Sequence, residues 1–144
     1  MASRAIKVPV SFWIIAGLSL LWNAYGAFDY TMTQLDAEAV MGQFSVEERA
    51  YLSSFPAWHT AFWALGVWGS LLGSVLLLAR SRWAVASFLL SLLGLTVTTI
   101  YTATRPMPAS LDGPGYWGVT IVVWAVLLAL LWYSRRALAR GYIA

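Results

Sequence analysis

Six polar side chains within or beside long apolar stretches are the candidates for chemistry in this chain. They supply one amide, one carboxylate, one imidazole, one guanidinium and two phenols: Asn23, Asp29, Tyr30, His59, Tyr101 and Arg105. Such groups can hydrogen-bond a polar ligand, and ionisable groups at membrane depth often serve a function. We therefore predict an outward-facing polar pocket. The alternative is a structural network that fixes the register of the helices.

The residue types give little support to catalysis. The chain has one histidine and no cysteine, which excludes bis-histidine haem ligation and thiolate metal sites within one chain. HExxH, GxSxG and paired carboxylates inside the apolar stretches are missing from the sequence. The Gly113-Pro114-Gly115 turn lacks the GK[ST] that a phosphate loop requires. We expect no enzyme activity, no catalytic residue, no metal site and no cofactor.

The composition indicates whether water or lipid surrounds the segments that carry these side chains. Hydrophobic residues make up 60% of the 144 residues, and charged residues make up 10%. Soluble domains have about 45–50% apolar and about 25% charged residues. A chain of this size cannot bury so much apolar surface in its own core, so lipid must cover the remainder.

Four apolar segments are long enough to cross a bilayer, which takes about 20 helical residues. They cover residues 10–33, 57–79, 83–104 and 116–134. Lipid offers no partner to backbone N–H and C=O groups, so helices are expected. The predicted fold class is all-α: a polytopic membrane protein, with residues 1–144 forming a single four-transmembrane-helix bundle. We read the first segment as a retained span, because it is too long for the core of a signal peptide.

The loop charges predict the orientation of the bundle. Seven of the nine basic residues fall before the first span, between spans two and three, or after span four: Arg4, Lys7, Arg80, Arg82, Arg135, Arg136 and Arg140. Acidic residues gather in the other loops. The positive-inside rule then places both termini in the cytoplasm. It also explains the pI near 9.5 without a nucleic-acid partner.

The first outer loop, about residues 34–56, contains a helix signal. Ser45 and Glu48 have the spacing of a capping box, which predicts a short interfacial helix over residues 46–54. This helix either covers the end of the bundle or acts as a lid over an outer cavity.

Small residues predict how spans two and three pack. Span two carries Gly66, Gly69 and Gly73, and span three carries Ser87, Ser91 and Gly94. Such stripes let helices approach closely in lipid, and the Arg80–Arg82 connection forces an antiparallel hairpin. The sequence does not decide whether the second stripe packs inside the chain or against another copy.

Depth separates two polar residues of the first span. Counting from Ser11 at 1.5 Å per residue, Asn23 lies about 18 Å into the membrane and Asp29 lies about 27 Å in. Asp29 is therefore near the outer boundary, where it can reach water. Asn23 is too deep for that and is expected to hydrogen-bond a neighbouring helix.

Several stretches together resemble a family of small four-span bacterial inner-membrane proteins that are often labelled "sugar transporter". The stretches are LLWNAYGAFDYTMT, FPAW, FWALGVWGSLLGSVLLLARSRWA, FLLSLLG and LLWYSRRALARGY. The resemblance covers nearly the whole chain and implies the fold and the compartment. It assigns no catalytic or binding residue.

Two functions follow as expectations. The leading one is a non-enzymatic accessory or interaction subunit that joins a homo-oligomer or a larger membrane complex, through its small-residue stripes. The alternative is a carrier or binding protein for a small solute such as a sugar, acting as an oligomer with an outward-facing polar pocket. A third, weaker alternative is a lipid or quinone binder that uses the deep tryptophans.

Overall fold

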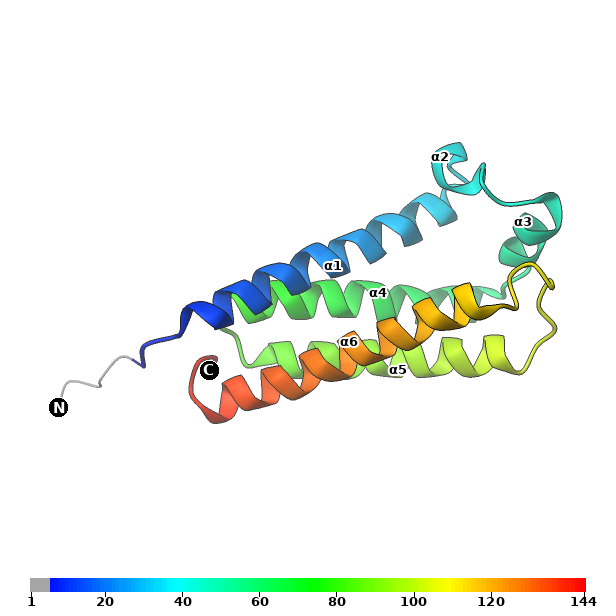
Figure 1. The fold of residues 1–144 in the computed structure, drawn as a ribbon. Helices are drawn as coiled ribbons and strands as arrows, with labels where there is room; N and C mark the ends of the chain where they lie inside the picture. Colours follow the sequence, from blue (N-terminus) through cyan, green and yellow to red (C-terminus); the bar gives the residue numbers. More distant parts are fainter. Residues whose placement is uncertain (1–5) are drawn as a thin grey trace.

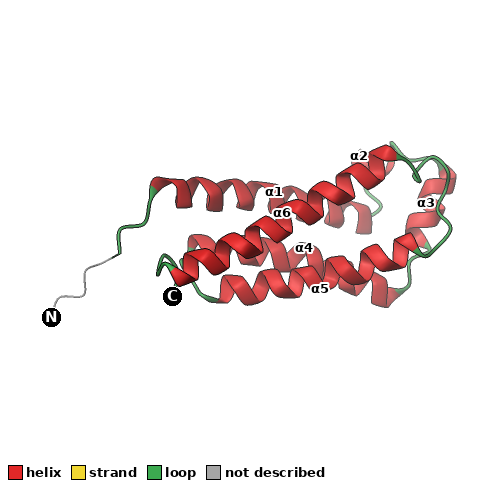
Figure 2. Ribbon diagram, turned by 60° about the horizontal axis from the view of Figure 1, so that its bottom comes forward, coloured by secondary structure: helices red, strands yellow, loops and turns green. Residues whose placement is uncertain are grey.

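The computed structural model describes residues 6–144, and its elements are all helices and loops (Figure 1). The four long helices are α1 (Val10–Gln34), α4 (Ala57–Leu78), α5 (Trp83–Ala103) and α6 (Pro114–Ala139). Two short helices, α2 (Glu38–Met41) and α3 (Val46–Ser53), lie in the connection between α1 and α4. Figure 2 shows the same arrangement from a second side, with no strand among the described residues.

All four long helices are long and apolar enough to cross a membrane. At most 28% of each apolar window is buried inside the protein, so most of the apolar surface of the helices faces outward. In water this exposure would be strongly unfavourable, whereas in lipid it is expected. The chain is therefore a multi-pass membrane protein whose four spans lie in a lipid bilayer.

The helix bounds follow the predicted segments closely, with one extension. Helix α6 begins at Pro114, which suits the first helical position because its missing N–H is not needed there. It continues to Ala139, beyond the apolar segment that ends near residue 134. The added turn carries Arg135 and Arg136, whose positive charge favours the C-terminal end of a helix.

Helices α4 and α5 form the tightest pair, through the predicted small residues. Ser87 Oγ donates a hydrogen bond to the Gly69 carbonyl at 2.7 Å. Ser91 Oγ donates to the Gly66 carbonyl at 2.5 Å. A Cβ atom on Gly94 would lie 2.5 Å from the Gly66 nitrogen. Backbone contact of this kind requires glycine, because any side chain would push the helices apart.

The same hairpin accommodates a large ring. The Phe88 ring is fully buried and lies where a Cβ atom on Gly73 would be, at 2.7 Å. Both small-residue stripes thus pack against each other within one chain, so the second stripe is not left free for another copy. Helix α1 packs on α4, and α6 packs on α5 (Figure 1).

The C-terminal residues form a clasp, Tyr142–Ala144, on the turn between α4 and α5. The Arg82 N–H donates to the Ala144 carbonyl at 2.9 Å, and the Ala144 N–H donates to the Arg80 carbonyl at 3.0 Å. Arg80 Nε also donates to the Tyr142 carbonyl at 2.7 Å. Ile143, between them, is buried in the apolar core at this end of the bundle. The start of α1 lies at the same end (Figure 1).

The capping box predicted in the first outer loop is confirmed. Ser45 Oγ accepts from the Glu48 N–H at 3.2 Å, and Glu48 Oε2 accepts from the Ser45 N–H at 2.7 Å. The neighbouring Ser110 hydroxyl and the hydrogen bond from the Ser45 N–H hold the pKa of the Glu48 carboxyl below its ordinary value.

Candidate functional site

Asn23 joins α1 to α4 at membrane depth. Its Nδ2 donates to Ser74 Oγ at 2.8 Å and to the Ser70 carbonyl at 3.2 Å. Ser19 Oγ, one turn earlier on α1, also donates to Ser74 Oγ at 3.0 Å. We call Ser19, Asn23, Ser70 and Ser74 the polar latch. Both amide N–H groups of Asn23 are satisfied by a neighbouring helix, as its depth predicts.

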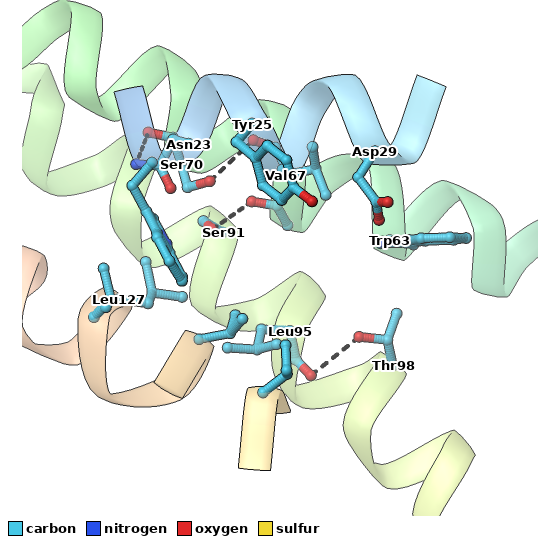
Figure 3. A pocket seen from close by; sticks show the side chains of 16 residues that line it. Asn23, Tyr25, Asp29, Trp63, Val67, Ser70, Ser91, Leu95, Thr98 and Leu127 are labelled. Carbon is cyan, nitrogen blue, oxygen red and sulfur yellow. Dashed lines mark hydrogen bonds between the residues drawn. The ribbon is translucent and has the colours of Figure 1, made fainter. Parts of the chain in front are cut away.

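Next to the polar latch lies an inner cavity of about 250 Å³. All four long helices contribute to its wall, and Figure 3 shows the side chains that line it. They are Trp22, Asn23, Tyr25, Gly26, Asp29, Trp63, Gly66, Val67, Ser70, Ser91, Leu95, Thr98, Val119, Val123, Val126 and Leu127. Most of these side chains are apolar, so the cavity resembles a small-molecule site with few polar groups.

An outer cavity of about 330 Å³ lies towards the α2–α3 connection. It shares six lining residues with the inner cavity: Asp29, Trp63, Leu95, Thr98, Val119 and Val123. Its wall also includes His59 from α4, Tyr51 from α3 and four further threonines, Thr33, Thr99, Thr102 and Thr120. The short helix α3 therefore contributes to a cavity wall instead of only covering the end of the bundle.

Asp29 stands where the two cavities meet. Its side chain points towards Trp63 and the space below α1 (Figure 3). Among residues 6–144, no hydrogen bond or ion pair holds its carboxylate. It is also the only formally charged residue among those that line either cavity. A carboxylate in such a position needs water, a proton or a ligand as its partner.

His59 and Tyr51 also have unpartnered polar atoms. His59 is only 3% exposed, and neither of its ring nitrogens has a hydrogen-bond partner among the described residues. The buried hydroxyl of Tyr51 has none either. Buried polar atoms usually have a partner, so unsatisfied ones beside a cavity mark a place where a water or a ligand can bind. Burial also raises the pKa of the Tyr51 phenol, so the phenol remains protonated.

The predicted polar residues divide into two groups in the structure. Asn23, Asp29 and His59 line the cavities. The other three lie outside both linings and pack on aromatic rings: Tyr30 against Trp63 at 5.0 Å, Tyr101 against His59 at 4.6 Å, and Arg105 over the Tyr101 ring at 4.6 Å. Arg105 is thus stacked on a ring, and the structure does not pair it with Asp29.

Sequence reasoning missed several lining residues. Trp63 lines both cavities, although its type alone suggests ordinary packing in a membrane helix. Val119 and Val123, which line the α6 side, carry no polar signal. Gly26 differs from the hairpin glycines because a Cβ atom there would meet nothing within 4 Å. Only the packing of four helices identifies such residues.

Comparison of the chain with protein-family models, with curated proteins and with solved structures gives no match. The resemblance to the four-span family therefore stays a prediction. The candidate site depends on its own geometry: one unpaired carboxylate, one unpartnered imidazole and a largely apolar wall.

Proposed function

We propose that this protein is a non-enzymatic membrane protein that binds, and as an oligomer carries, a small solute in its two adjoining cavities. The observation that carries the proposal is Asp29, an unpaired carboxylate in a cavity built by all four spans. The six shared lining residues indicate that the cavities are continuous. The unpartnered atoms of His59 and Tyr51 support the proposal from the outer side.

The proposed setting is a bacterial inner membrane with both termini in the cytoplasm, as the loop charges and the family resemblance favour. Asp29, His59 and the α3 helix then belong to the outward half of the protein. Four spans are few for a carrier, because known carriers move one repeat or bundle against another. Transport would therefore need a homodimer or a larger assembly, whereas binding would not.

An accessory subunit is the second candidate, and the polar latch favours it. The latch gives Asn23 a structural role, so that residue no longer requires a ligand. The small-residue stripes, however, are used inside the α4–α5 hairpin. A partner protein would have to bind another surface, and none of the described contacts indicates which one.

Native mass spectrometry of the gently purified protein tests the proposal. Gly26→Leu would project a side chain into the inner cavity, since a Cβ there meets nothing within 4 Å. Gly17→Leu is the matched control, because Gly17 is on the same helix, has equally open surroundings and lies outside both linings.

We expect a bound small molecule in the natural protein and in Gly17→Leu, and its loss in Gly26→Leu. A compound retained equally in Gly26→Leu would contradict the proposed site. A stoichiometric partner protein, with no small molecule, would favour the accessory subunit instead.

A further inference from the structure

We propose that the cavities select an organic cation with an apolar body, and that Asp29 supplies the counter-charge. This inference rests on the proposed function and names the class of solute. Three features of the site support it: its charge, its aromatic wall and its opening.

The charge of the site is negative and locally uncompensated. Asp29 is the only formally charged lining residue, and neither lysine nor arginine lines either cavity. The two basic residues on the same side of the chain are engaged elsewhere. Arg49 Nη2 binds Glu38 Oε2 at 3.1 Å, and Arg105 lies over the Tyr101 ring. A carboxylate in a poorly hydrated cavity attracts a cation much more strongly than one in water does.

Aromatic rings line the same cavities as this carboxylate. Trp63 lines both cavities together with Asp29. Trp22 and Tyr25 add rings on the inner side, and Phe55 and Tyr116 add rings on the outer side. Aromatic faces bind organic cations, and tryptophan does so best. An anion would gain nothing comparable from this wall.

The rest of the wall suits an apolar body. Leu95, Val119, Val123 and Leu127 line the inner cavity, and they can contact hydrocarbon but offer no hydrogen bonds. Tyr25 is 69% exposed and Val119 is 63% exposed, although both line the inner cavity. They come from α1 and α6, so the opening between these helices faces lipid. A solute dissolved in the bilayer can reach Asp29 by this route.

A pair of isosteric probes separates charge from shape. Benzyltrimethylammonium is permanently cationic, and neopentylbenzene has carbon in place of its nitrogen. Binding of each probe is measured by equilibrium dialysis against the full-length protein in nanodiscs, with empty nanodiscs subtracted. Quenching of tryptophan fluorescence gives a second readout, because Trp22 and Trp63 line the site.

We expect the cation to bind the natural protein at least about ten-fold more tightly than the neutral probe, as an ion pair in a partly desolvated site predicts. Asp29→Asn should remove this preference and Asp29→Glu should retain most of it. Asp36→Asn is the control: Asp36 is an exposed acid just beyond α1 and lines neither cavity. Circular dichroism and gel filtration establish that each variant is folded.

Two results would overturn the inference. One is equal binding of both probes that Asp29→Asn leaves unchanged; the other is no binding of the cation. If Gly26→Leu still abolished neutral-probe binding, solute binding would stand and only the selection of cations would fail. If Gly26→Leu changed the binding of neither probe and native mass spectrometry found no bound compound, the proposed function itself would fail.

Discussion

Asn23 and Asp29 lie six positions apart on one helix, yet the structure uses them differently. The amide of Asn23 is fully engaged as a donor by α4. The carboxylate of Asp29 has no partner among the described residues and faces open space. The first residue is therefore explained by helix packing, whereas the second requires a solute, water or a proton. Depth in the membrane anticipates the role of Asn23, but it suggests an ordinary exposed acid for Asp29.

Removing the polar latch should weaken the contact between α1 and α4. Asn23→Leu and Ser74→Ala each remove one partner of the 2.8 Å hydrogen bond, and interhelical hydrogen bonds in membranes contribute about 0.6–2 kcal/mol. We expect each variant to lower the free energy of unfolding by an amount in this range. The double variant should lose less than the sum of the two. Unfolding in mixed micelles measures all three values.

Ser53→Ala provides the control, because Ser53 is exposed and its hydroxyl bonds only within its own helix. Strictly additive effects of Asn23→Leu and Ser74→Ala would mean that the two side chains do not interact.

Among the elements, the α4–α5 hairpin is the part that the sequence predicts best. The stripe residues Gly66, Ser91 and Gly94 meet as their spacing predicts, because so short a connection permits only an antiparallel pair. The capping box at Ser45 and the start of α6 at Pro114 are equally local signals. Helix α2 escaped prediction because a single turn has no periodicity to read.

Enlarging Gly94 should disrupt this hairpin. A Cβ atom there would lie 2.5 Å from the Gly66 nitrogen, so Gly94→Ala must move one backbone away from the other. We expect a loss of about 1–3 kcal/mol in the free energy of unfolding, as overpacking usually causes.

Gly118→Ala is the matched control, because a Cβ on Gly118 in α6 meets nothing within 4 Å. It should leave stability unchanged or raise it slightly, since alanine favours a helix more than glycine does. A Gly94→Ala protein as stable as Gly118→Ala would mean that α4 and α5 do not pack in this way.

At the scale of the whole molecule, the four spans can be predicted from the sequence, whereas most of the residues that line the cavities cannot. Span length and hydropathy are properties of each segment separately. A cavity depends on how far apart the helices are held, and apolar residues such as Val119 and Val123 give no sign of facing one. The same limit applies to Trp63, whose importance comes from its position beside Asp29.

The orientation of the whole molecule gives a further test. If the positive-inside rule holds, a reporter that works only in the cytoplasm should be active when it is joined after Ala144 by a flexible linker. A reporter that works only in the periplasm should be active when it is inserted next to Gly42, in the exposed part of the α2–α3 connection. The reverse pattern would place Asp29 and both cavities on the cytoplasmic side and would invert the proposed direction of solute access.

The clasp of Tyr142–Ala144 ties the helices together at one end of the bundle. At that end, backbone hydrogen bonds tie the tail that follows α6 to the α4–α5 turn, and the Phe12 ring of α1 packs on Tyr133 and Tyr142. At the other end, α1 continues into the connection that carries α2 and α3 (Figure 1). The clasp holds three of the four long helices together at its own end, so we expect the helices to separate less easily there. Any change in the width of the cavities should therefore be largest at the α3 end and smallest at the clasp.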